Sequence, residues 1–178
     1  MSTYIIESIE TRRFGPEDIG GLYDYLQKLG VESKRRFSPH SFDQQSIADF
    51  YQKPDEHLGY LAFDHTTREI IAYAIVKIGF FEHDRFRLEG YGLRLDSTTD
   101  CIYAPSVADK WQSCGLGNAM FQQIKSDLSA RGIRRIILWG GVQSDNKRAI
   151  RFYLKNGFKT LGTFEYQGLN EDMILEIG

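Results

Sequence analysis

The sequence predicts an α/β (α+β) fold in which one mixed sheet is flanked by helices, within a single domain over residues 1–178. Segments whose apolar residues recur at helical spacing alternate with segments rich in β-branched and aromatic residues. The run 133–142 is mostly apolar, which is typical of a strand that is buried on both faces beside a parallel neighbour. The runs 57–63 and 70–78 flank a polar turn, and this pattern predicts an antiparallel hairpin.

The amino-terminal part predicts a strand and two helices before this hairpin. We expect the first strand over residues 3–9. A helix should begin within residues 14–18, because a proline stands in its first turn with acidic residues beside the positive end. Gly30 is suited to end this helix. Ser41 and Gln44 have the spacing of a capping box and predict the start of the second helix.

The carboxy-terminal part predicts the remaining strands and helices. Residues 82–100 are polar and are expected to form a loop or a short hairpin. The strand over 101–107 contains Pro105, which cannot donate to a ladder, so a kink or bulge is expected there. The other expected elements are helices over 117–131 and from Ser144 to 157, and strands over 133–142, 158–164 and 173–177.

Composition excludes several classes of protein. The formal net charge is −2, whereas nucleic-acid binders usually carry a basic excess. The two cysteines, Cys101 and Cys114, are too few for a disulfide scaffold and lack metal-ligand spacing. Residues 1–10 show no secretory pattern, and the most apolar run, 70–81, is too short to cross a bilayer. We therefore expect a cytoplasmic protein that needs no metal and binds neither nucleic acid nor a membrane; a homodimer is left open.

The stretch Gln112–Asn118 is the clearest candidate for a binding site. It contains Gly115 and Gly117 between a strand-like run and a helical one. The first N–H groups of a helix have no partner within it and lie at the positive end of its dipole, so such a turn can bind an anion. The dinucleotide fingerprint fails because Met120 stands where a third glycine is required, and the P-loop fails because Asn118 follows Gly117.

A second motif follows this turn. The motif residues are Val107, Gln112, Gly115 and Gly117 in the first segment, and Asn146, Ala149, Phe152, Tyr153, Lys155, Gly157 and Phe158 in the second. In this spacing they closely resemble the GNAT superfamily of acyl-CoA-dependent N-acyltransferases. The resemblance covers roughly residues 101–160, and the expected elements from residue 3 onward are compatible with the same fold.

The resemblance implies a mostly antiparallel sheet whose two central parallel strands, 101–107 and 133–142, splay apart to hold the pantetheine arm of acetyl-CoA. It implies that Val107 binds this arm through its backbone and that a bulged N–H near Ser106–Val107 faces the thioester oxygen, where charge develops. The implied cofactor-binding residues are Val107, Gln112, Ser113, Cys114, Gly115, Leu116, Gly117, Asn118 and Asn146.

The resemblance also implies a general acid, but it leaves the general base unassigned. Tyr153 stands at the position of the usual general acid, which protonates the leaving thiolate. Some members carry a glutamate where this chain has Gly141, so no side chain at that point can accept the proton of the amine. Alternatives are a chain of water molecules or one of the side chains Glu89, Asp100, Asp109 and His40. A site without a strong base suits an amine of low pKa, such as an α-amine or an aminosugar.

The acceptor is expected at residues 34–42, which correspond to the segment between the first two helices. Arg35 and Arg36 could bind a carboxylate or phosphate of the acceptor, together with Phe37 and His40, although such charged runs are often only solvated. The implied activity is transfer of an acetyl group to a primary amine of a small molecule or peptide. Alternatives are a longer acyl donor, or an acyl-CoA-binding sensor without turnover.

Overall fold

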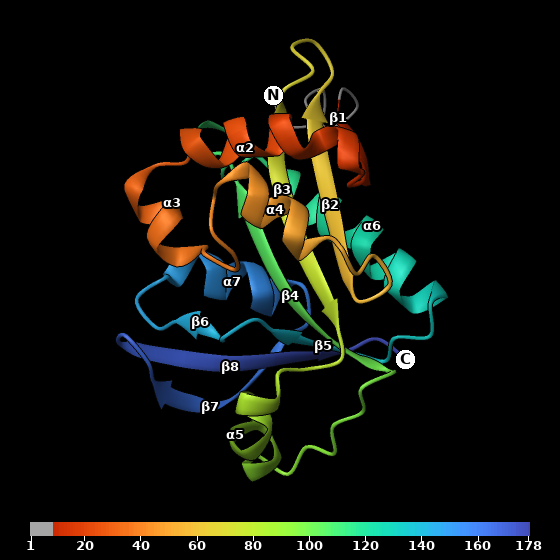
Figure 1. Ribbon diagram of the computed structural model, residues 1–178. Helices are drawn as coiled ribbons and strands as arrows, with labels where there is room; N and C mark the ends of the chain where they lie inside the picture. Colours follow the sequence, from red (N-terminus) through yellow and green to blue (C-terminus); the bar gives the residue numbers. More distant parts are fainter. Residues whose placement is uncertain (1–8) are drawn as a thin grey trace. The chain divides into compact units, whose positions relative to one another are not determined.

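The computed structural model describes residues 9–178, so the strand expected over residues 3–9 lies almost wholly outside the described residues (Figure 1). The chain forms two compact units: the first comprises Met1–Val76 with Ala104–Ile124, and the second comprises Lys77–Tyr103 with Lys125–Gly178. The expectation of a single domain stays a prediction.

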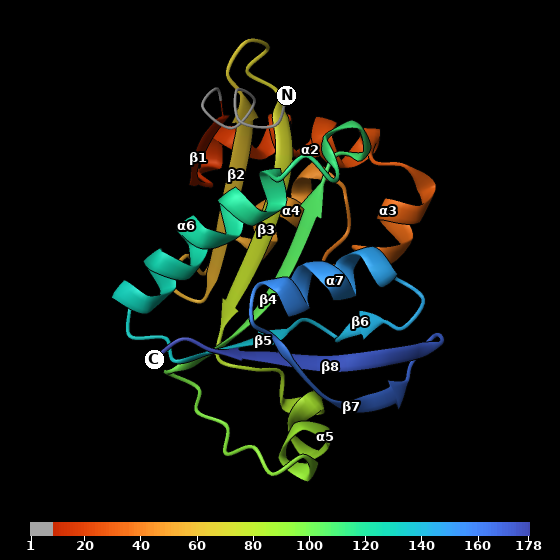
Figure 2. The same ribbon diagram turned by 180° about the vertical axis from the view of Figure 1, so that it is seen from behind.

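The first unit contains the amino-terminal part of the sheet. Its strands are β1 (Ile9–Arg13), β2 (His57–Asp64), most of β3 (Ile70–Ile78) and the end of β4 (Asp100–Val107), in the order β1-β2-β3-β4. Its helices are η1 (Pro16–Asp18), α2 (Ile19–Lys28), α3 (Val31–Arg36), α4 (Gln44–Phe50), η3 (Asp109–Trp111) and the first part of α6 (Leu116–Ala130). Helices α2 and α4 lie on one face of these strands and α6 lies on the other (Figures 1 and 2).

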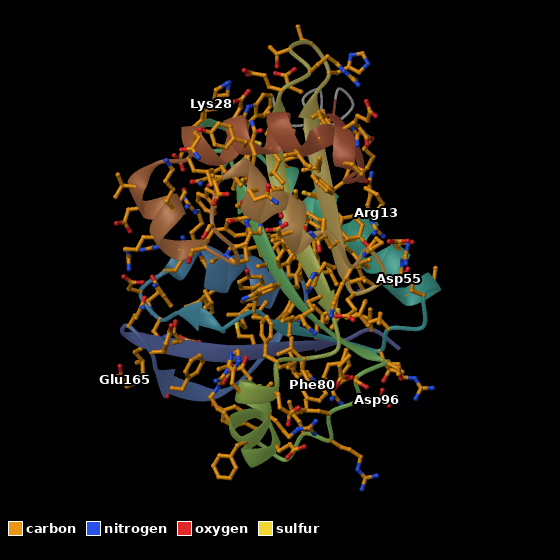
Figure 3. All side chains as sticks on the ribbon, in the orientation of Figure 1. Arg13, Lys28, Asp55, Phe80, Asp96 and Glu165 are labelled. Atoms are coloured by element: carbon orange, nitrogen blue, oxygen red, sulfur yellow. The ribbon has the colours of Figure 1, made fainter. Side chains whose placement is uncertain are left out.

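The local signals at the first helix and the hairpin are confirmed. Pro16 stands in the first turn of η1, and the backbone N–H of Gly15 donates to the carboxylate of Asp18 at 2.8 Å. Strands β2 and β3 are neighbours in the sheet, and their turn is closed by a hydrogen bond from Asp64 N to Glu69 O. Charged side chains such as Lys28, which forms an ion pair with Glu69, lie at the periphery of this unit (Figure 3).

Two expectations at the ends of helices in the first unit are wrong. Gly30 does not close α2 in a left-handed conformation; its φ is −65° and it is the N-cap residue of α3, a helix that the sequence did not predict. Helix α4 is capped by Asp43 rather than Ser41, because the Asp43 side chain accepts the N–H of Ser46. The cap is therefore displaced by two residues along the chain.

The second unit contains the carboxy-terminal part of the sheet. Its elements are η2 (Glu82–Asp84), α5 (Arg85–Gly90), the start of β4, the end of α6, β5 (Arg135–Leu138), β6 (Val142–Gln143), α7 (Lys147–Lys155), β7 (Lys159–Glu165) and β8 (Leu169–Glu176). The strand order is β4-β5-β8-β6, with β7 also paired to β8. Only β4 and β5 are parallel among the pairs described here, which confirms a mixed and mostly antiparallel sheet. Helix α7 lies along one face of β5, β8 and β6 (Figure 2).

Three expectations for the second unit are corrected. The strand predicted over 133–142 is broken into β5 and β6, because Gly140 and Gly141 have φ of 64° and 68° and form a left-handed turn. Residues 85–90 form α5 rather than a loop or hairpin. Helix α7 is capped by Asn146 instead of Ser144. None of the described helices is long and apolar enough to cross a membrane.

Candidate functional site

The glycine turn, residues 112–118, connects η3 to α6 in the first unit. Ser113 and Gly115 have φ of 62° and 93°, which places both in the left-handed region. Leu116 begins α6 and is buried, so it anchors the turn to the core. The other residues from Ser113 to Asn118 are exposed or half-buried. The turn therefore presents backbone N–H groups at a helix start, where an anion is stabilised.

Two side chains of the turn are occupied by internal hydrogen bonds. The Gln112 amide donates to the carbonyl of Val107 at 3.0 Å and to the carboxylate of Asp109 at 3.1 Å. The Cys114 thiol donates to the carbonyl of Trp111 at 2.9 Å. These two side chains hold the shape of the turn.

Asp109 connects the glycine turn to α3. The sequence did not predict this connection. The Asp109 carboxylate accepts the N–H of Gly30 at 2.7 Å and the hydroxyl of Ser33, in addition to the amide of Gln112. An aspartate at the start of a turn commonly accepts backbone N–H groups. Gly30, however, lies 79 residues away in the sequence, so no local pattern could identify this partner.

The end of β4 lies next to the glycine turn in the chain and is held by side-chain and backbone hydrogen bonds. Ser106 is buried, and its hydroxyl contacts both the hydroxyl of Tyr25 at 2.9 Å and the carbonyl of Tyr73 at 3.2 Å. The N–H of Ala108 donates to the carbonyl of Ile71 on β3 at 2.9 Å. Val107, the predicted pantetheine-binding residue, is half-buried between these two attachments.

The predicted acceptor-binding residues lie on α3 and in the segment after it. Arg35 and Arg36 form ion pairs with Glu32 on the same helix, at 2.9 Å and 3.5 Å. Phe37 is only 5% exposed and packs edge-on against Tyr73. The cations are thus near the surface, whereas the phenylalanine belongs to the core.

His40 is the start of a hydrogen-bonded chain inside the first unit. Its Nδ1 lies 2.7 Å from the carbonyl of Ser41, so in the neutral ring this nitrogen carries the hydrogen. Its Nε2 then accepts from the hydroxyl of Tyr73 at 3.0 Å, and Tyr73 in turn accepts from Tyr51 at 2.6 Å. Burial lowers the pKa of His40, against the opposing influence of the Ser41 carbonyl and Asp43. The ring is therefore neutral at pH 7.

The second unit contains the other two predicted site residues, Asn146 and Tyr153. The Asn146 side chain accepts the N–H of Ala149 at 3.3 Å and so begins α7. Tyr153 is 7% exposed, and its ring packs against Phe152 and Phe158. Burial raises the pKa of Tyr153, so its hydroxyl stays protonated at neutral pH.

The acidic side chains considered as bases each have a partner in the structure. Glu89 pairs with Arg85, Asp100 accepts from Arg135 at 3.3 Å, and Asp109 holds α3 as described. Burial raises the pKa of Asp100. Among residues 9–178, no group of three or more His, Cys, Asp or Glu side chains could hold a metal ion.

Comparison with known proteins identifies a related family. The family model described as "Acetyltransferase (GNAT) family" matches residues 23–158. A search of curated protein sequences found no match.

Three solved structures illustrate the shared fold. The GNAT domain of S. lividans PAT is 20% identical, with a TM-score of 0.74 over 94% of this chain and 90% of that one. The putative acetyltransferase yncA from Salmonella typhimurium, solved with acetyl-CoA, is 14% identical, with a TM-score of 0.72 over 96% and 94%. The aminoglycoside acetyltransferase AAC(6')-Ib, solved with coenzyme A, is 19% identical, with a TM-score of 0.69 over 95% of each chain. At these identities the likeness shows the fold.

Proposed function

Because the chain belongs to the GNAT acetyltransferase family, we propose that it transfers an acetyl group from acetyl-CoA to a primary amine of a small molecule or peptide. The observation that carries this proposal is the glycine turn, whose left-handed Ser113 and Gly115 present backbone N–H groups at the start of α6. Such a turn suits the pyrophosphate of coenzyme A. Two of the similar structures were solved with coenzyme A or acetyl-CoA.

In this proposal the donor is held mainly by backbone groups. The N–H groups of residues 113–118 bind the pyrophosphate, and the backbone of Val107 binds the pantetheine arm. Residues 104–107 of β4 extend beyond the parallel ladder with β5, which ends at the pair Tyr103 and Leu138. Asn146 orders the first turn of α7 and binds the cofactor arm, as the resemblance implies.

The acetyl transfer needs one proton to be delivered and one to be removed. The amine nitrogen attacks the thioester carbon, the carbon–sulfur bond breaks, and the sulfur leaves as a thiolate. Tyr153 donates its phenolic proton to this thiolate, a role that a buried and protonated tyrosine can fill. The amine proton passes to water or to a side chain that the proposal does not assign.

The acceptor is proposed to be an amine of low pKa. Presenting an alkyl amine of pKa about 10.4 in its neutral form at pH 7 costs about 4–5 kcal/mol, but an α-amine near 8 costs only about 1 kcal/mol. Gly141 supplies no base at the position where some members carry a glutamate. An α-amine or aminosugar therefore fits this site better than a lysine side chain.

Arg35 and Arg36 are proposed to contact the acceptor, whereas Phe37, which is buried, and His40, which is hydrogen-bonded to Tyr73, act from inside the unit. Arg35 pairs with Glu32 at the surface, and such pairs contribute little stability, so it can exchange this partner for a carboxylate or phosphate of the acceptor. The half-buried Arg36 pairs with the same glutamate at 3.5 Å. Phe37 and His40 hold the conformation of the segment that follows α3. A cytoplasmic location and a homodimer stay predictions.

A screen of thiol release tests the proposal. Wild-type protein is mixed with acetyl-CoA and, in turn, amino acids, aminosugars, polyamines and peptides with free amino termini. Amine-dependent release of coenzyme A, with mass spectrometry showing an acetylated amine, is the expected result. A chain that binds acetyl-CoA but acetylates no amine in the panel would contradict the proposal and favour the sensor alternative.

A further inference from the structure

The end of β4 is joined to its neighbour β3 by backbone hydrogen bonds, such as that from the N–H of Ala108 to the carbonyl of Ile71 at 2.9 Å, and by the side chain of Ser106. Pro105 has no N–H and cannot donate to a strand ladder. The next residue, Ser106, is 8% exposed, and its hydroxyl donates to the carbonyl of Tyr73 on β3 at 3.2 Å. This hydrogen bond adds a side-chain link between β4 and β3.

Tyr25 on α2 supplies the second hydrogen bond to this serine. The two hydroxyl oxygens lie 2.9 Å apart. A serine hydroxyl has one hydrogen, which goes to Tyr73, so Tyr25 must be the donor. Tyr25 is 4% exposed, and burial raises the pKa of Tyr25, so it remains a donor throughout the neutral range. The Ser106 hydroxyl is therefore held by two elements, β3 and α2.

On this geometry, we propose that Tyr25 is a positioning residue for acetyl transfer, acting through Ser106 on the β4 backbone that receives the thioester. The inference rests on the proposed function, in which the backbone near Ser106 and Val107 binds the donor. Tyr25 does not react, because its only hydroxyl hydrogen is committed to Ser106. Its contribution is to keep the backbone N–H aligned with the thioester oxygen, where charge develops during the reaction.

A loss of this alignment should affect chemistry more than binding. Donors that stabilise an oxyanion act only over a narrow range of distances, whereas the pyrophosphate of coenzyme A is held by the glycine turn, which Tyr25 does not contact through Ser106. The Tyr25→Phe variant keeps the ring in the core and removes only the hydroxyl. The Ser106→Ala variant removes the intermediary, and Ser106→Thr retains a hydroxyl at that position.

The experiment measures kcat for each variant and, by calorimetry, the Kd values of coenzyme A and acetyl-CoA. We expect Tyr25→Phe to lower kcat about tenfold, which is less than the roughly 10²–10³-fold loss on deleting an oxyanion donor. The Kd of coenzyme A should change less than about twofold, while the preference for acetyl-CoA over coenzyme A falls. The double variant Tyr25→Phe/Ser106→Ala should be no slower than the slower single variant, because both act through one path. Ser106→Thr should keep most of the wild-type kcat.

Tyr91→Phe is the matched control. It removes a tyrosine hydroxyl that donates to Asp172 at 3.0 Å in the second unit, and we expect a lower melting temperature with kcat unchanged. The inference is overturned if Tyr25→Phe behaves like this control, with wild-type kcat and the wild-type ratio of the two Kd values. If wild-type protein binds acetyl-CoA but acetylates no amine, the proposed function fails, and the ratio of Kd values still decides the role of Tyr25.

Discussion

The carbonyl oxygen of Glu171 lies 2.7 Å from the point where a Cβ on residue 141 would stand. Gly141 also has a φ of 68°, in the left-handed region that disfavours side chains. The absence of a glutamate at this position is therefore built into the backbone. The left-handed backbone at Gly141 therefore has two consequences. It breaks the predicted strand, and it leaves no room for a side chain that could act as the base.

We predict that Gly141→Glu destabilises the protein without adding a catalytic base. Left-handed strain costs about 1–3 kcal/mol, and displacement of the Glu171 backbone adds to it. Gly140→Glu is the matched control, since Gly140 has a similar φ of 64° but no atom within 4 Å of an added Cβ. Urea unfolding should show that Gly141→Glu lowers the free energy of unfolding more than Gly140→Glu does. Equal losses would mean that the carbonyl of Glu171 moves aside freely.

Tyr153→Phe should slow the reaction at least about tenfold while acetyl-CoA still binds, because the leaving thiolate loses its proton donor. Steady-state thiol release and calorimetry measure the two effects separately. The control is Tyr166→Phe, which changes an exposed tyrosine in the same unit and should retain wild-type kcat. An unchanged kcat in Tyr153→Phe would exclude this hydroxyl as the acid.

The double variant Arg35→Gln/Arg36→Gln should raise the acceptor KM about threefold or more for an acceptor with a carboxylate or phosphate. The affinity for acetyl-CoA should stay as in wild type, because the variant leaves the glycine turn unchanged. Arg131→Gln is the control: Arg131 forms a comparable exposed pair with Asp127 on α6, at 3.1 Å. If the double variant has the same acceptor KM as this control, Arg35 and Arg36 are solvated side chains that do not bind the acceptor.

His40 should make the stability of the protein depend on pH. Burial lowers the pKa of His40 in the folded state below its ordinary value of about 6.5, so the unfolded state binds the proton more readily. The contribution to stability is full above pH 6.5 and is lost as the pH falls through the two pKa values. Free energies of unfolding at pH 7.5 and pH 5.5 should differ less in His40→Gln than in wild type. The same difference in both proteins would contradict this assignment.

The elements that sequence patterns predicted best are those set by local signals. The helical start at Pro16 and the turn between the hairpin strands β2 and β3 both depend on neighbours in the chain. Caps at Asp43 and Asn146 were missed because several serine, aspartate and asparagine residues compete near each helix start. Which of these residues caps the helix is decided only when the whole helix packs.

The candidate site was predictable in position but not in arrangement. The glycine turn does open α6, and Tyr153 does lie on α7. Their roles in binding and catalysis stay predictions. The side chains of Tyr25 and Asp109 gave no signal of their contacts, since their partners lie 81 and 79 residues away in the sequence.

The sequence by itself determined the family resemblance, the order of most elements and the glycine turn, because spacing and backbone preference are local properties. Only the tertiary structure decided that the Gln112 amide donates to Val107 and Asp109 and that the Ser106 hydroxyl is hydrogen-bonded to both Tyr25 and Tyr73. It also decided that residue 141 has no room for a side chain beside Glu171. These outcomes depend on atoms that meet when distant segments pack, and no pattern along the chain encodes those distances.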